Sequence, residues 1–112
     1  LEPIQGEGGI IIPDDNYLSE LRSICDDQKW LLMVDEVQSG FCRTGKWFGY
    51  QHSGVIPDVV TVAKALGNGV PIGACLTNGM SSSILTPGSH GSTFGGNFLS
   101  TTVGLKVLDI MK

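Results

Sequence analysis

The spacing of hydrophobic and polar positions changes several times along the chain, and each spacing predicts a different element. Residues 14 to 28 begin with cap-type aspartates, and apolar side chains then recur three or four positions apart, which predicts an amphipathic helix. Its apolar positions are Leu18, Leu21, Ile24 and Cys25. A closing helix is predicted after Asn97, with apolar positions at Leu99, Val103, Leu105, Val107, Leu108 and Met111.

Two apolar runs between these helices predict strands. Residues 30 to 34 read Trp-Leu-Leu-Met-Val and lead into Asp35, whereas residues 58 to 62 end two positions before Lys64. Continuous runs of this kind are typical of parallel strands that are buried on both faces. The connection over residues 37 to 57 is long enough for a parallel crossover. We therefore expect Asp35 and Lys64 at the carboxyl edge of one sheet, where α/β folds place their sites.

The remaining segments complete an α/β fold with a mostly parallel sheet. Residues 72 to 77 are apolar and follow a tight turn, so they are expected to pair antiparallel at an edge. Residues 79 to 90 read as a short helix or loop, and residues 90 to 97 as a polar, glycine-rich loop. Residues 1 to 13 are predicted to form a loop that follows a strand.

Composition and charge narrow the classes of function. A chain of 112 residues with 41% hydrophobic content forms at most one domain. The net charge of -4 argues against a nucleic-acid or anionic-membrane partner, since both need a basic face. Cys25, Cys42 and Cys75 match neither a zinc site nor a disulfide framework, which fits a reducing cytoplasm. We interpret the missing initiator Met and the helical pattern up to Lys112 as signs of a longer protein.

Asp35 and Lys64 are the first candidates for chemistry. A lysine in a dry pocket loses hydration, its pKa falls, and the neutral amine can form a Schiff base with an aldehyde. A carboxylate on the neighbouring strand can pair with a protonated ring nitrogen, as pyridoxal chemistry requires. Taken separately, however, a strand-end aspartate is often a helix cap, and most lysines are surface charges.

Two other stretches suggest phosphate binding. Residues 31 to 36 have the form of a Walker B strand, and residues 40 to 46 nearly fit a phosphate loop, but Trp47 replaces the magnesium-binding hydroxyl and the order is reversed. Residues 90 to 97 offer glycine N–H groups and hydroxyls to an anion, or form a structural loop in which Asn97 caps the last helix. His52 and His90 are isolated, so no metal site is predicted.

Five motifs, in order, resemble the signatures of class III pyridoxal-phosphate aminotransferases, with the greatest similarity to acetylornithine-type members. The motifs are Glu2-Pro-Ile-Gln-Gly-Glu-Gly-Gly9, Val34-Asp-Glu-Val-Gln-Ser-Gly40 with Arg43-Thr-Gly45, Pro57-Asp58 through Ala63-Lys-Ala-Leu-Gly67, Pro71-Ile-Gly-Ala74, and His90-Gly-Ser-Thr-Phe-Gly-Gly-Asn97. The resemblance implies that residues 1–112 are part of the cofactor-binding large domain of a fold-type I enzyme. The N-terminal part of that domain and a small C-terminal domain would then be absent.

The resemblance also implies roles for individual residues. Lys64 matches the lysine that bonds to pyridoxal 5'-phosphate and later moves the substrate proton. Asp35 matches the aspartate that is paired with the pyridine nitrogen. Glu36 and Val37 match the cofactor-contacting strand end, with Val37 against the ring face, and Gln38 matches a residue near the ring hydroxyl.

Three further residues are assigned by the same resemblance. Thr93 matches a threonine that reaches across a homodimer interface to the cofactor phosphate of the partner subunit. Ser92 matches the adjacent residue near the substrate. Glu7 matches a glutamate that pairs, in ornithine-type members, with an arginine near the substrate carboxylate, and that arginine is not in this chain.

The implied function is a ping-pong transfer of an amino group from an ω-amine such as N-acetylornithine to 2-oxoglutarate, in cytoplasmic arginine biosynthesis. Ornithine or other ω-amino-acid aminotransferases and glutamate-semialdehyde aminomutases are alternatives within the fold. A nucleotide triphosphatase and a non-catalytic scaffold are alternatives from other classes. The phosphate cradle, the ring-stacking aromatic residue and the substrate arginines are not found here, so we predict that the segment alone is inactive.

Overall fold

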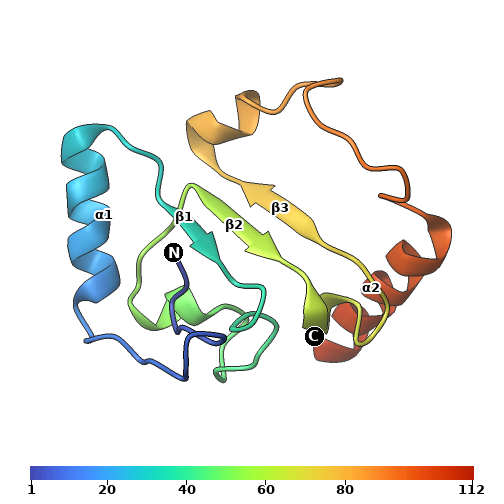
Figure 1. Ribbon diagram of the computed structural model, residues 1–112, viewed down its shortest axis with the longest axis horizontal. Helices are drawn as coiled ribbons and strands as arrows, with labels where there is room; N and C mark the ends of the chain where they lie inside the picture. Colours follow the sequence, from blue (N-terminus) through green and yellow to red (C-terminus); the bar gives the residue numbers. More distant parts are fainter.

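The computed structural model describes all 112 residues and confirms the predicted alternation of helices and strands (Figure 1). The helices and strands are α1 (Tyr17–Gln28), β1 (Met33–Asp35), β2 (Val59–Val62), β3 (Ala74–Thr77) and α2 (Phe98–Met111). Three short 3-10 helices, η1 (Gly49–His52), η2 (Lys64–Leu66) and η3 (Gly79–Ser83), interrupt the connections. No helix combines the length and the apolar character needed to cross a lipid bilayer.

The strands form one sheet in the order β1-β2-β3. β1 and β2 are parallel, with Met33 opposite Val59, whereas β2 and β3 are antiparallel, with Val62 opposite Ala74. Both predicted pairings are therefore confirmed. On the other side of β1, the Leu1 amine donates to the Met33 carbonyl at 3.1 Å, and the Asp35 N–H donates to the Leu1 carbonyl at 2.7 Å. Leu1 is thus hydrogen-bonded to β1 in the pattern of a parallel pair, and the N-terminal loop follows it.

Two hydrophobic clusters join the helices to the sheet. One contains residues of α1, β1 and the connection that follows, namely Leu18, Cys25, Leu32, Val34 and Val55. The other contains Phe41, Val60, Val62 and Leu66, against which Leu108 and Met111 of α2 pack. The helices thus lie on either flank of the sheet in Figure 1. Asn97 caps α2 as predicted, because its Oδ1 accepts the Ser100 N–H at 3.0 Å.

The predicted burial of both faces holds for β2 and fails for β1. Val59 and Val60, which point to opposite faces of the central strand, are both buried. In β1, by contrast, Val34 is buried whereas Met33 is 52% exposed, and Trp30 and Leu31 just before it are exposed as well. These apolar side chains therefore remain in contact with solvent.

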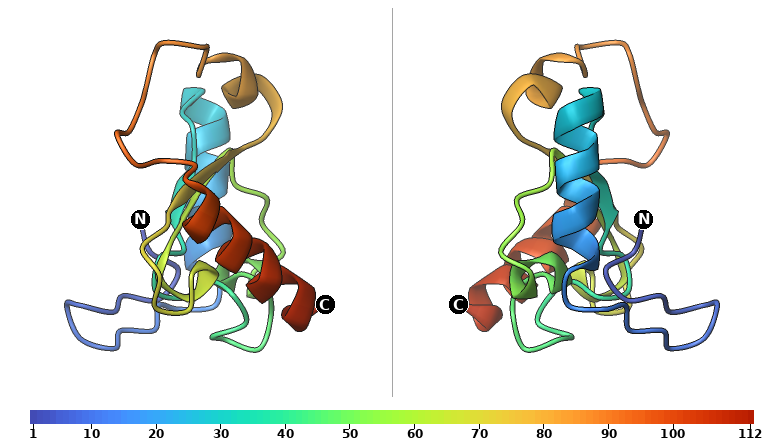
Figure 2. Two further views of the ribbon diagram at one scale, coloured as in Figure 1. Left: turned by 90° about the vertical axis from the view of Figure 1, so that its right-hand side faces the viewer. Right: turned by 90° about the vertical axis from the view of Figure 1, so that its left-hand side faces the viewer.

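Two long loops project from the body of the molecule (Figure 2). The N-terminal loop is closed by backbone hydrogen bonds between Gln5 and Ile11, at 3.0 and 3.2 Å. The segment between η3 and α2 swings away from the sheet before it enters α2 (Figure 1). It carries the glycine-rich residues 90 to 97, all of them exposed.

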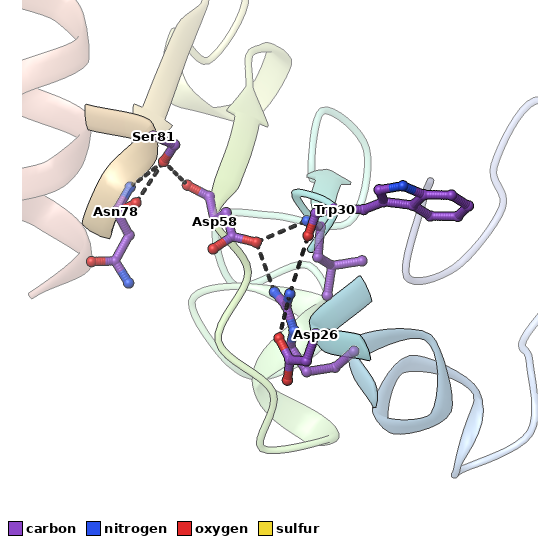
Figure 3. A network of polar contacts seen from close by, with 7 residues as sticks. Asp26, Trp30, Asp58, Asn78 and Ser81 are labelled. Atoms are coloured by element: carbon purple, nitrogen blue, oxygen red, sulfur yellow. Dashed lines mark hydrogen bonds and ion pairs between the residues drawn. The ribbon is translucent and has the colours of Figure 1, made fainter. Parts of the chain in front are cut away.

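The amino edge of the sheet is organised by Asp58, immediately before β2 (Figure 3). Its Oδ2 accepts hydrogen bonds from the Arg22 guanidinium at 2.7 Å and from the Leu32 N–H at 2.8 Å. The Asp58 carbonyl accepts from the Ser81 hydroxyl at 2.8 Å and from the Asn78 N–H at 2.9 Å. A single residue thereby joins α1, the start of β1 and the end of β3.

The charge on this network is compensated locally. The hydrogen bond from Arg22 is the main reason why the pKa of the Asp58 carboxyl lies below its ordinary value, and the same bond raises the pKa of Arg22. Arg22 also forms an ion pair with Asp26 at 2.7 Å, one turn further along α1. The amino edge is therefore a structural, charge-paired region.

Candidate active site

A cavity of about 1010 Å³ opens beside the carboxyl edge of β1 and β2. Its wall is formed by the turn after β1, the segment that follows β2 and the N-terminal loop. Its wall includes Gly6, Val37, Gln38, Ser39, Arg43 and Lys64. The structure thus brings three of the predicted site residues, Val37, Gln38 and Lys64, to one cavity.

Lys64 occupies this cavity because β2 ends two residues earlier and η2 begins at Lys64 itself. Its φ of 38° lies in the left-handed region, which a residue with a side chain rarely adopts. Backbone strain of this kind costs about 1–3 kcal/mol and clusters at functional sites. Lys64 takes part in none of the ion pairs of the chain, so its amine is available to a ligand.

Residues 1–112 do not by themselves form a dry pocket around Lys64. Lys64 is exposed, because the cavity is open to solvent. These 112 residues therefore position the amine without shielding it from water.

The turn after Lys64 depends on one glycine. Gly67 donates its N–H to the Lys64 carbonyl at 3.0 Å, and its own carbonyl accepts from the Val70 N–H at 3.0 Å. A Cβ atom on Gly67 would lie only 2.0 Å from the Val70 carbonyl oxygen. Only glycine permits this close backbone approach, which turns the chain from η2 back toward β3.

Asp35 ends β1 and is half-buried. Its Oδ1 accepts the Val37 N–H at 2.9 Å, which is the short-range bond of an Asx turn. This bond fixes the carboxylate in one orientation and occupies one of its two oxygens. Asp35 is not itself part of the cavity wall, although Val37, to which it is hydrogen-bonded, is.

Gln38 lies between the strand-end turn and the N-terminal loop. A Cβ atom on Gly6 would collide with the side-chain amide of Gln38, so the loop passes directly over it. The loop is held in part by Glu2, whose Oε2 accepts the Gly6 N–H at 3.1 Å. Gln38 is therefore a wall residue of the cavity with a confined side chain.

Glu36 is placed differently from its neighbours. Its side chain is 0% exposed and does not line the cavity. The carboxylate instead accepts hydrogen bonds from the Ser39 hydroxyl, the Gly49 N–H and the Tyr50 N–H, at 2.8, 2.9 and 2.8 Å. Both oxygens are thus engaged inside the protein. Sequence reasoning placed Glu36 in the cofactor-contacting strand end and missed these partners.

Glu7, Ser92 and Thr93 are not brought to Lys64. All three are exposed, and none lines the cavity. The Ser92 hydroxyl accepts the Gly95 N–H at 3.1 Å, which shapes the loop before α2. Their assigned roles remain predictions.

The connection between β1 and β2 contributes cavity residues that the sequence did not single out as candidates. Arg43 and Thr44 both line the cavity, and the Arg43-Thr-Gly45 motif was the available signal. The same connection is not a phosphate loop, because the 3-10 helix η1, rather than an α-helix, follows it. Lys46 donates to the Gln51 carbonyl at 3.1 Å instead of pointing to a ligand site.

Comparison with known proteins gives one consistent result. The family described as aminotransferase class-III matches residues 1–112. The acetylornithine aminotransferase of Nitrosomonas europaea is 58% identical over 112 residues, which is all of this chain and 28% of that protein. The succinylornithine transaminase of Salmonella paratyphi A is 55% identical over 111 residues, 99% of this chain and 27% of that protein. The chain therefore spans a little over a quarter of the length of these relatives.

A solved structure supports the likeness in three dimensions. The ornithine aminotransferase of Toxoplasma gondii, crystallised with oxidised glutathione and with pyridoxal phosphate at partial occupancy in its active site, superposes with a TM-score of 0.93. The two sequences are 43% identical, and the match covers 99% of this chain and 26% of that chain. Sequence and fold thus agree over nearly every residue described above.

Proposed function

Because the chain belongs to the class III aminotransferase family, we propose that its cavity binds pyridoxal phosphate and that Lys64 forms the covalent bond to it. The observation that carries this proposal is the position of Lys64. A strained left-handed backbone holds an amine that has no ion-pair partner, in a cavity of about 1010 Å³ at the carboxyl edge of two parallel strands.

The residues of the cavity fit this cofactor. The volume is ample for a small aromatic phosphate, since ligand pockets usually measure about 300–1,000 Å³. Lys64 offers a primary amine, Gln38 offers an amide, and Val37 offers an apolar surface for a ring face. Asp35 does not line the cavity but is bonded to its wall residue Val37, and it retains one carboxylate oxygen for a cationic ring nitrogen, because Val37 uses only its Oδ1.

The proposed division of labour follows from these groups. When bound, pyridoxal phosphate supplies an aldehyde that bonds to amines and a ring that withdraws electrons. Lys64 Nζ holds the cofactor and, when free, takes the proton from the substrate carbon that carries the amino group. The Asp35 carboxylate keeps a positive charge on the ring nitrogen, and Val37 and Gln38 orient the ring.

The proposed reaction is ping-pong transfer of an amino group from an N-acylated ornithine to 2-oxoglutarate. The names of the relatives from Nitrosomonas and Salmonella support an acylornithine donor. Ornithine is the second candidate, because the superposed Toxoplasma enzyme is an ornithine aminotransferase. We further propose a homodimer in which Thr93 reaches the partner's cofactor phosphate, with Ser92 and Glu7 near the substrate. The exposure of these three residues leaves them accessible for such contacts.

Residues 1–112 would form part of the cofactor-binding large domain of a longer enzyme. The open cavity and the exposed second face of β1 support this, since both expose groups that a complete domain would cover. We therefore expect the 112-residue chain alone to show no turnover.

The experiment compares that chain with a chimera, in which residues 1–112 replace the matching part of the Nitrosomonas acetylornithine aminotransferase. After addition of pyridoxal phosphate, the chimera should show the near-visible absorption of the lysine-bound cofactor and produce glutamate from N-acetylornithine and 2-oxoglutarate. The chain alone should show no turnover. A folded chimera that binds no cofactor would contradict the proposed site, and a preference for free ornithine over N-acetylornithine and N-succinylornithine would contradict the proposed donor.

A further inference from the structure

Glu36 is a buried carboxylate with no cation beside it. Its side chain is 0% exposed, and none of the ion pairs of the chain includes it. Burial of a charge is costly unless hydrogen bonds replace the lost water. Glu36 meets this condition with the Gly49 N–H on Oε2, the Tyr50 N–H on Oε1 and the Ser39 hydroxyl on Oε2.

The backbone of Glu36 is fixed as firmly as its side chain. Its N–H donates to the Thr61 carbonyl of β2 at 2.9 Å, and its carbonyl accepts the Gly40 N–H at 2.9 Å. A Cβ atom on Gly40 would lie 2.7 Å from that carbonyl oxygen. The turn over residues 36 to 40 is therefore attached to the sheet by its backbone and to the start of η1 by the Glu36 carboxylate.

The residues on either side of Glu36 belong to the candidate active site. Asp35 precedes it, and Val37, Gln38 and Ser39 follow it and line the cavity. Val37 is coupled directly to Asp35 through its N–H. We propose that Glu36 is a positioning residue, which sets the orientation of Asp35, Val37 and Gln38 toward the cofactor without touching it. This inference rests on the proposed function of the cavity.

The proposal depends on the carboxylate and not only on side-chain size. Gly49 and Tyr50 each donate to a different oxygen, so both carboxylate oxygens of Glu36 must accept a hydrogen bond. In Glu36→Gln, an NH₂ group replaces one of the two carboxylate oxygens and faces a backbone N–H, and the two donors repel each other. The turn must then shift. A misplacement of about 1 Å in an active site can cost roughly 100-fold in rate.

The test uses two carboxylate-to-amide substitutions in the chimera. Glu36→Gln changes the carboxyl edge, and Asp58→Asn is the matched control, because Asp58 also accepts a backbone N–H but lies at the amino edge. For Glu36→Gln, we expect the Kd for pyridoxal phosphate to rise about tenfold, a change of ~1.4 kcal/mol, while Asp58→Asn stays within about twofold. In the cofactor-free protein, hydrogen exchange of the Gly49 and Tyr50 amides should accelerate only in Glu36→Gln.

The result that would overturn the proposal is an equal change in the Kd for both variants at equal losses of thermal stability, or no change for Glu36→Gln. Where Glu36→Gln does not fold, Gly49→Ala replaces it. The new Cβ would lie 3.2 Å from the Pro3 side chain and 3.4 Å from both Glu36 carboxylate oxygens, outside the cavity wall, so it crowds the point where Glu36 holds η1 and the Kd should again rise. An unchanged Kd in Gly49→Ala would then count against the proposal. Failure of the unsubstituted chimera to bind cofactor would instead refute the proposed function.

Discussion

Asp58 at the amino edge of the sheet and Lys64 at its carboxyl edge are charged residues with opposite surroundings. At the amino edge, Asp58 is bonded to the Arg22 guanidinium and to the Leu32 N–H, and the charge is neutralised within the chain (Figure 3). At the carboxyl edge, Lys64 takes part in no ion pair, and Asp35 uses one oxygen on the nearby Val37 N–H. Both edges belong to the same short strands, so the difference is not one of fold but of which groups are left without partners.

Charged residues with and without partners inside the protein contribute to different properties, the former to stability and the latter to chemistry. A charge that has all its partners inside the protein contributes to folding and has nothing left to offer a ligand. A charge held in place by the backbone and left unpaired can bind and react, although it costs stability. Substitutions at the carboxyl edge should therefore lower turnover, and substitutions at the amino edge should lower stability. Equal effects at both edges would contradict this distinction.

The largest effect is expected from Lys64→Ala in the chimera. The proposed covalent attachment of the cofactor and the proposed proton transfer both need this amine, and proton transfer alone is worth about 10²–10⁴-fold in rate. Turnover should fall by at least that factor, measured as glutamate formation. Lys46→Ala is the matched control, because Lys46 only donates to the Gln51 carbonyl and should leave turnover unchanged. Retention of function by Lys64→Ala would favour a non-catalytic scaffold.

Asp35→Asn should have the next largest effect. The amide oxygen can still accept the Val37 N–H, so the turn should persist, while the negative charge toward the ring nitrogen is lost. An opposite charge at close range shifts a pKa by about 1–3 units, or ~1.4–4 kcal/mol, so turnover should fall about 10–1,000-fold. Steady-state kinetics and the thermal midpoint should be measured together. A loss of stability that matches the loss of turnover would contradict a role in chemistry.

Asp58→Asn should affect stability and spare chemistry. The substitution weakens the charge-assisted bond from Arg22, and hydrogen bonds to charged groups contribute about 1.5–3 kcal/mol. The free energy of unfolding, measured by urea denaturation of the chimera, should fall by roughly this amount. Turnover per folded molecule should not change. A loss of turnover larger than the loss of folded protein would show that the two edges are not separate.

A smaller, graded effect is expected from pH. The pKa of Asp58 is lowered in the folded state, chiefly by the hydrogen bond from Arg22. Its contribution to stability is therefore complete above the unfolded pKa, near about 3.9, and is lost as pH falls through the lower folded value. The stability difference between the unsubstituted chimera and Asp58→Asn should shrink over this range. Urea denaturation at pH 7 and in steps below pH 4 measures it, and a constant difference would contradict the assignment.

Much of the fold could be predicted from the sequence because it depends on local patterns. The spacing of apolar residues located α1 and α2, and the apolar runs located β1 and β2. The length of the connection between the runs then predicted a parallel pair. The burial of the second face of β1 was predicted wrongly, because an apolar run indicates what a strand can pack against and not whether that partner is present among these residues.

The candidate site was predictable only in part. The strand ends predicted Asp35 and Lys64 at one edge of the sheet, whereas Val37 and Gln38 were assigned by resemblance. Val37, Gln38 and Lys64 line one cavity, and Asp35 does not. Two of the three partners of the Glu36 carboxylate lie 13 and 14 residues away, and no local pattern indicates that Gly49 and Tyr50 will donate to it. Glu7, Ser92 and Thr93 were also assigned by resemblance, and none of them lines the cavity.

The central claim is that Lys64 is the cofactor-binding amine, and the most direct test is chemical. The chimera is incubated with pyridoxal phosphate, the lysine–cofactor bond is reduced with borohydride, and the modified peptide is identified by mass spectrometry. The modification should lie on Lys64 and on none of the other lysines of the segment, which are Lys29, Lys46, Lys106 and Lys112. Modification of one of these in place of Lys64, or no modification of the folded chimera, would contradict the claim.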